Sequence, residues 1–286
     1  MVELSTGCLC CKVRGDLAAT LADLLARREL GTVMAFERIV IETSGLADPA
    51  PILHALMLDD ELGRRLALGA VVATVDALGG LATLAREPIS VKQVAIADRL
   101  VLTKTDLVAG SAGPLREHLQ ALNPTAPLIL ADHGRIDADW LLGPALETDA
   151  QARRAHAWLD EVIATTPTGH HDVAIETYAV IREAPVRAVA LTLFLETLAE
   201  HCGNGLLRIK GILAVAEHPE RPAVIHGVQH VFHPPEWPER WPSDDRRCRL
   251  VLIVRGIQRA WVEALLDAIE AEVAEAENDS SAARSS

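Results

Sequence analysis

The sequence has 286 residues, half of them hydrophobic, and a formal net charge of −13 at pH 7. This length and apolar content suffice for one large core or two ordinary ones, so a folded globular protein is expected. The acidic balance argues against sequence-independent binding to nucleic acid or to an anionic membrane surface, because both need clustered lysine and arginine.

The chain carries no recognisable secretory signal, because its first residues contain neither a basic region nor an apolar one. The longest apolar stretch, residues 69–85, contains Asp76 and is shorter than the roughly 20 residues of a membrane-spanning helix. A cytoplasmic protein without membrane segments is therefore expected, and clustered cysteines stay reduced in that compartment.

Three cysteines, Cys8, Cys10 and Cys11, lie within four residues, directly after Gly7. As thiolates they can hold a soft or borderline ion such as Zn²⁺, Cu⁺ or Co²⁺ and leave room for a further ligand. Two other interpretations stay open. Cys8 and Cys11 also have the CxxC spacing of redox motifs, and cysteines can pack as small hydrophobic residues. The isolated Cys202 and Cys248 are expected to be core or partly buried residues rather than metal ligands.

Short apolar strands and amphipathic helices alternate in the first half of the chain. Asp16 is expected to cap a helix that ends at Gly31, and Asp48 to cap a second helix that begins at Pro49. Strands are predicted at residues 38–41, 71–75, 100–102 and 127–130, with helices at 91–97 and around 115–122. This alternation predicts right-handed βαβ units and a parallel sheet.

The pattern changes after about residue 142. Residues 143–172 are polar and predict a linker that could contain a helix over 150–163. A strand at 173–181, a helix at 186–201, and strands at 206–215, 223–232 and 249–254 follow. A last helix would place Trp261, Leu265, Ile269 and Val273 on one face. This order predicts a small α+β domain at 173–277, and the serine-rich tail, 278–286, is expected to be disordered.

The end of the predicted strand at 38–41 is a candidate phosphate-sensing loop. In an α/β sheet, ligands bind beyond the carboxyl ends of the strands. Glu42 is placed like the acidic residue that holds Mg²⁺ through water in a nucleotide hydrolase, and Gly45 could offer its N–H to a γ-phosphate. The competing interpretation, with about equal weight, is an ordinary helix-capping turn.

The loop after residues 100–102 approximates the N-K-x-D guanine-reading signature, with Thr103, Lys104 and Asp106 at the matching positions. The Asp106 carboxylate could accept hydrogen bonds from the ring N–H and from the exocyclic amine of guanine, a paired contact that adenine cannot make. The aliphatic part of Lys104 would cover the base.

Together these motifs resemble those of the CobW family of P-loop GTPases. Members of that family are proposed to act as metal chaperones or metal insertases. The residues that carry the resemblance run in the family's order: residues 7–11 are similar to its GCxCC motif, residues 42–49 to its Walker B and switch segment, and residues 103–106 to its base-recognition loop. Residues 205–211 and 226–232 look like the CobW C-terminal domain.

The resemblance implies an α/β fold, a P-loop NTPase-like parallel sheet with helices on both faces over residues 1–142, followed by the small α+β domain. Two departures are visible. Thr103 stands where the family has asparagine, and no run in the chain matches G-x-x-x-x-G-K-[ST], the loop that holds the phosphates and Mg²⁺. We therefore expect the nucleotide domain to be incomplete at its N-terminus, and expect no measurable GTP hydrolysis by this chain alone.

The function implied by the resemblance is GTP-dependent delivery of Zn²⁺, Co²⁺ or a similar divalent metal to a client metalloprotein or a metal-cofactor biosynthesis enzyme. A homodimer is possible. Cys8, Cys10 and Cys11 would carry the ion, Glu42 and Gly45 would sense the γ-phosphate with Mg²⁺, and Thr103, Lys104 and Asp106 would bind GTP. Two alternatives remain: a metal-binding module without NTPase activity, and a CxxC redox protein.

Secondary metal binding by histidines is a further possibility from the sequence. His226 and His230 are four residues apart in a predicted strand and would share a face, with His233 nearby. His170 and His171 lie in the predicted linker. Ordinary hydrogen-bonded histidines are the competing interpretation.

Overall fold

The computed structural model describes residues 12–108, 112–143 and 175–284. Its N-terminal part contains a parallel sheet in the order β1 (Val72–Asp76), β2 (Arg99–Thr103) and β3 (Leu128–Leu130). Three of the four strands expected from the sequence are thus confirmed. The connections are helical, as parallel pairing requires, because a parallel strand can be reached only by a crossover.

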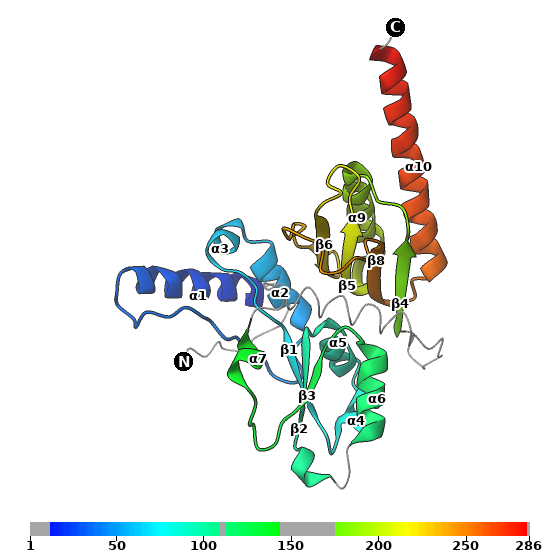
Figure 1. Ribbon diagram of the computed structural model, residues 1–286. Helices are drawn as coiled ribbons and strands as arrows, with labels where there is room; N and C mark the ends of the chain where they lie inside the picture. The colour runs from blue at the N-terminus through cyan, green and yellow to red at the C-terminus, as the bar shows by residue number, and fades with distance from the viewer. Residues whose placement is uncertain (1–11, 109–111, 144–174, 285–286) are drawn as a thin grey trace.

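The core of this sheet lies under three helices, α4 (Gly80–Arg86), α5 (Pro88–Ile96) and α6 (Gly113–Leu122) (Figure 1). Its buried side chains come from the strands and from these helices: Val75, Leu84, Val94, Leu100, Leu102, Leu115 and Leu119. The sequence did not predict α4. That helix can approach closely because a Cβ on Gly80 would lie only 2.8 Å from a methyl carbon of Leu115.

The prediction of a strand at residues 38–41 is wrong, because these residues are irregular and Val40 is 70% exposed. A strand needs a hydrogen-bonded neighbour. In the described part of the chain β1 pairs with β2 alone, and residues 38–41 pair with no strand. The apolar run therefore lacks the partner that would make it a strand.

Three further helices complete the first half before β1: α1 (Lys12–Glu29), α2 (Pro49–Met57) and α3 (Asp60–Arg65). The prediction for Asp48 is confirmed, since its side chain caps α2 by accepting from the Ala50 N–H. The prediction for Asp16 is wrong, because α1 already begins at Lys12 and Asp16 lies inside it. Gly31 follows the helix end with a φ of +68°, a conformation that glycine adopts without strain.

Two short helical segments accompany the parallel sheet: η1 (Thr105–Leu107) directly after β2, and α7 (Ala138–Leu142) after β3. Residues 144–174 lie outside the described residues, and so do most of the predicted linker and the helix expected at 150–163.

The second half is an antiparallel sheet in the order β4 (Ile175–Arg182), β8 (Cys248–Arg255), β5 (Leu206–Ala214), β6 (Pro222–Val228) and β7 (Val231–Phe232). Helices α9 (Ala188–Cys202) and α10 (Arg259–Arg284) pack on one face, and η2 (Gly203–Gly205) joins α9 to β5. Figure 1 shows the C-terminal end of α10 projecting beyond this domain. The expected α+β architecture is confirmed.

Three details differ from the expectations. Residues 223–232 form the hairpin β6–β7 rather than one strand, because Gln229 turns the chain with a φ of +55°. Of the four residues expected on the buried face of α10, Trp261 is 41% exposed, whereas Val273 is buried and Leu265 and Ile269 pack against the core. Val262 and Leu266 add to this face. The tail expected to be disordered from residue 278 continues α10 as far as Arg284, since extending an already formed and packed helix adds a hydrogen bond for each residue that is fixed.

The two halves meet where the second face of the antiparallel sheet lies against α2 and α5. Ala95 of α5 packs with Leu207 and Ile253 of the sheet, and Ile96 packs with Val228. Asp98, at the end of α5, accepts from Arg208 and Lys210 of β5. The interface thus combines an apolar layer with a buried ion cluster.

Candidate functional site

The carboxyl ends of β1, β2 and β3 lie at one edge of the parallel sheet, and the loops that leave them form the candidate nucleotide site. Parallel pairing places Asp76, the last residue of β1, directly beside Thr103, the last residue of β2. In sheets of this type the crevice outside the strand ends binds the ligand. The base-recognition residues predicted from the sequence therefore lie in the expected place.

Hydrogen bonds to both neighbouring strands fix the loop of residues 103–106. The Thr103 hydroxyl donates to the Val75 carbonyl over 3.2 Å, and the Thr105 hydroxyl donates to the Ala131 carbonyl over 3.3 Å. Thr103, which replaces the family's asparagine, thus still ties this loop to β1. The sequence did not predict that contact.

Lys104 adopts a left-handed backbone conformation, with a φ of 56°, and its ammonium group contacts the Asp76 carboxylate at 2.5 Å. The hydrogen bond from Lys104 lowers the pKa of Asp76 below its ordinary value, against the effect of burial. The ion pair holds the Lys104 ammonium group beside the end of β1.

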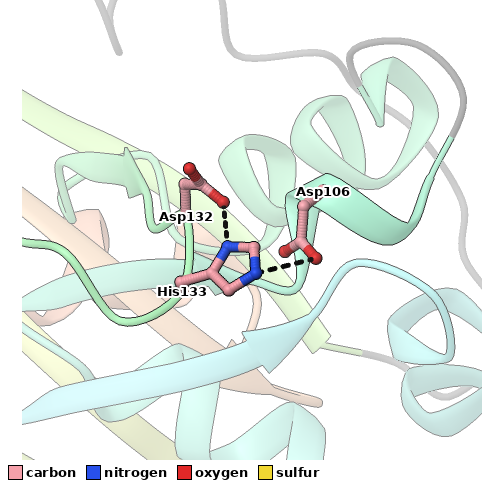
Figure 2. Close-up of side chains that lie close together, drawn as sticks. All are labelled: Asp106, Asp132 and His133. Carbon is pink, nitrogen blue, oxygen red and sulfur yellow. Dashed lines mark hydrogen bonds and ion pairs between the residues drawn. The ribbon is translucent and has the colours of Figure 1, made fainter.

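Asp106 lies beside two side chains that the sequence analysis did not single out, Asp132 and His133 (Figure 2). His133 Nδ1 is 2.5 Å from an Asp132 carboxylate oxygen, and Nε2 is 3.9 Å from Asp106 Oδ2. The hydrogen bond with Asp132 and the charge of Asp106 raise the pKa of His133. The signal that could have found these residues is their position just after β3, the third strand of the same sheet.

In the described part of the chain, these three side chains form the one group of three or more His, Cys, Asp or Glu residues whose ligand atoms lie within 4.8 Å of one another. All three are exposed, and exposed acidic groups are common without an ion. Within this group, Asp106 lies beside a titratable imidazole, that of His133.

The segment 42–48, which we call the switch loop, leads into α2. Glu42 and Gly45 are exposed, in an irregular stretch closed by a hydrogen bond from the Ala47 N–H to the Ser44 carbonyl. The structure does not bring Glu42 next to the base loop through any recorded contact. It does reveal two partners of the switch loop on α5 that the sequence did not predict, Lys92 and Gln93.

The predicted metal ligands Cys8, Cys10 and Cys11 lie outside the described residues, as do His170 and His171. The two cysteines that the structure describes, Cys202 and Cys248, belong to no group of three or more potential metal ligands within the described ranges. Burial raises the pKa of Cys248 to about 11 and also raises that of Cys202.

The prediction that His226 and His230 share one face of a strand is wrong, because the chain turns between them. The ring of His230 packs on the ring of His54, with centroids 4.5 Å apart. Burial, together with the charges of Lys210 and Arg208, lowers the pKa of His226 to about 3, which keeps this imidazole neutral. No group of potential metal ligands including His226, His230 or His233 forms within the described ranges.

No helix among the described residues is both long enough and apolar enough to span a bilayer.

Comparisons with known proteins agree with this architecture. Residues 1–130 match the family model of the CobW/HypB/UreG nucleotide-binding domain, and residues 175–270 match that of the cobalamin synthesis protein CobW C-terminal domain. The chain is 34% identical over 260 residues to the zinc chaperone YjiA of Escherichia coli, a match that covers 89% of this chain and 77% of YjiA.

A second relative is the zinc-regulated GTPase metalloprotein activator 1 of Schizosaccharomyces pombe, 35% identical over 48% of this chain and 32% of its own length. Among solved structures, the crystal structure of Zn(II)-bound YjiA GTPase from Escherichia coli superimposes with a TM-score of 0.69. It is 29% identical and covers 87% of this chain and 76% of that one. The chain belongs to the CobW family, with a nucleotide-binding domain followed by a CobW C-terminal domain.

Proposed function

We propose that this protein is a GTP-dependent zinc chaperone that delivers the metal to a client metalloprotein in the cytoplasm. The observation that carries the proposal is family membership over nearly the whole chain, with relatives named as zinc chaperones and as a zinc-regulated GTPase metalloprotein activator. The placement of residues 103–106 at the strand ends, where such sheets bind ligands, supports the nucleotide part.

In this proposal Asp106 reads guanine. Its carboxylate lies at the edge of the loop held by Thr103 and Thr105, and a carboxylate is the acceptor that the two adjacent N–H groups of guanine require. Thr103 and Lys104 complete the base site. Glu42 would hold Mg²⁺ through water, and Gly45 would donate its N–H to the γ-phosphate.

The cargo would be held by Cys8, Cys10 and Cys11. Three thiolates suit Zn²⁺, the metal in the names of the relatives, and also Co²⁺. Hydrolysis of GTP would release the switch loop and, with it, the metal to the client. The client would be a metalloprotein or an enzyme of metal-cofactor synthesis, and the carrier could work as a homodimer.

The test is a titration of the full chain with Zn²⁺ and, separately, with Co²⁺, in the presence and absence of Mg-GTP. A variant with Cys8, Cys10 and Cys11 all changed to alanine is the control. The proposal expects metal binding that needs the three cysteines and that changes in affinity when Mg-GTP is added. Metal affinity that ignores GTP would contradict the switch, and no metal binding would contradict metal delivery altogether.

A second candidate is a metal-binding module without NTPase activity. The observation that favours it is the absence of any G-x-x-x-x-G-K-[ST] run from these 286 residues. A steady-state assay of phosphate release by the purified chain separates the two functions. Clear cysteine-independent turnover would rule out this second candidate, and no turnover above the rate measured without protein would favour it over release of the metal by GTP hydrolysis.

A further inference from the structure

Helix α5 lies between the switch loop and the C-terminal domain: side chains in its middle contact the loop, and its C-terminal end contacts the sheet. From the middle of the helix, the Gln93 amide donates to the carbonyls of Gly45, over 3.1 Å, and Ala47, over 2.8 Å. One side chain thus binds two backbone groups of the loop, on either side of Leu46. Such a double contact fixes the path of the chain, because both carbonyls must face the same donor.

Lys92, the neighbour of Gln93 on α5, adds an ion pair to the same loop. Its ammonium group lies 2.6 Å from Asp48 Oδ2, and the Lys92 side chain is 15% exposed. Asp48 uses its other carboxylate oxygen to cap α2. The end of the switch loop, the start of α2 and the middle of α5 are therefore joined through one carboxylate.

Side chains of the C-terminal sheet contact the C-terminal end of α5. Arg208 donates to the Ile96 carbonyl and to Asp98, and Lys210 contacts Asp98 at 2.8 Å. Asp98 also accepts from the Val71 N–H at the entry to β1. Burial opposes ionisation of Asp98, but the charges of Arg208 and Lys210 outweigh it and hold the pKa of this carboxyl below its ordinary value.

A second contact route runs through α2, the helix that follows the switch loop. His54 Nε2 lies 3.3 Å from the carbonyl of Val228, the last residue of β6. Leu53 of α2, Ile96 of α5 and Val228 share one buried cluster. Both helices that border the switch loop therefore rest on the same face of the C-terminal sheet.

We infer that Gln93 and Lys92 are positioning residues for the switch loop, and that Arg208 and Lys210 of the C-terminal domain set the helix that carries them. None of these four residues has a part in the proposed function, and two of them belong to the C-terminal domain. The inference rests on the proposed function only where the loop is said to respond to GTP. The contacts themselves can be tested without nucleotide.

The first test replaces Gln93 by glutamate, which keeps the size of the side chain and removes the N–H donor. Hydrogen exchange of the full chain is measured without nucleotide, by mass spectrometry on peptides covering residues 43–50. In Gln93→Glu, exchange in these peptides is expected to be about tenfold faster than in the wild type. Peptides from β8 should be unchanged. The matched control is Gln120→Glu, since Gln120 lies exposed on α6.

A rescue variant separates positioning from packing. Gln93→His offers an Nε2–H at a similar distance from the backbone and should restore part of the protection of residues 43–50. Exchange in Gln93→Glu equal to wild type would overturn the role of Gln93. Equal loss of protection in Gln93→Glu and Gln93→His would assign the effect to packing and would also overturn it.

The second test asks whether the C-terminal domain sets the loop from a distance. Lys210→Met leaves the Arg208 contact in place and touches no residue of the loop. The inference expects faster exchange in residues 43–50 as well as at the end of α5. The control is Arg182→Met, which removes an ion pair with Asp267 on the α10 side of the same sheet. Faster exchange at the end of α5 together with unchanged exchange in residues 43–50 would contradict the claim that the C-terminal domain positions the switch loop.

Adding Mg-GTP distinguishes this inference from the proposed function. Wild-type protein that shows no nucleotide binding would contradict the GTP-dependent function and leave the nucleotide-free results standing. If Mg-GTP does bind and protects residues 43–50 in the wild type, Gln93→Glu should lose most of that protection. Full protection in the variant would overturn the positioning role alone.

Discussion

His133 places a titratable imidazole 3.9 Å from Asp106, the carboxylate proposed to read guanine. Its other ring nitrogen is hydrogen-bonded to Asp132, and that contact raises the pKa of His133. A raised folded-state pKa means that the interaction stabilises the folded chain at pH values below the unfolded pKa and is lost as pH rises through the folded pKa. Protonated His133 therefore competes, at acidic pH, for the carboxylate that the base requires.

The prediction at this scale concerns Asp132→Asn. Removing the carboxylate that holds Nδ1 should lower the pKa of His133 toward its ordinary value, measured by NMR from the ring proton shifts across pH 5 to 9. The matched control is Asp137→Asn, which removes a carboxylate that caps α7 instead. An unchanged titration of His133 in Asp132→Asn would contradict the contact drawn in Figure 2.

At the scale of elements, the apolar pattern correctly located the strands that pair with a neighbouring strand. It failed for an apolar run that has no neighbouring strand to pair with. Residues 100–102 are buried on both sides in the centre of the sheet, so their run of apolar residues is informative. Residues 38–41 have the same character but no strand beside them in the described part. The role of Gln93 was missed because its two hydrogen-bond partners are distant in the sequence. Ala47 lies 46 positions before it and Gly45 lies 48 positions before it, and no local pattern encodes such contacts.

The element-scale prediction is Gly80→Ala, at the start of α4. A Cβ there would meet side-chain carbons of Leu115 at 2.8 Å and Val75 at 2.9 Å, so either these side chains or the helix must shift. The free energy of unfolding should fall by about 1–3 kcal/mol in urea titrations. Gly79→Ala is the control, since a Cβ at Gly79 meets nothing within 4 Å. Equal stability of the two variants would argue against the close approach of α4.

For the molecule as a whole, the domains are joined by charge as well as by apolar contact. Asp98 from the nucleotide-binding domain faces Arg208 and Lys210 from the C-terminal domain, and all three side chains are at most 10% exposed. Because the folded-state pKa of Asp98 is lowered, its contribution to stability is present above the unfolded pKa and is lost as pH falls through the folded pKa. Most of this interaction therefore persists through the physiological pH range.

Asp98→Asn should weaken the folded chain more than any surface ion pair does, because it leaves two buried cations without their carboxylate. The free energy of unfolding is expected to fall by about 3–5 kcal/mol in urea at pH 7. Asp267→Asn, at an ion pair whose carboxylate is 68% exposed, should cost less than about 1 kcal/mol. The difference between the two variants should shrink in strongly acidic buffer, where wild-type Asp98 also loses its charge. A similar small loss in both variants at pH 7 would mean that contacts other than the Asp98 charge, such as the apolar packing of Ala95 and Ile96, hold the domains together.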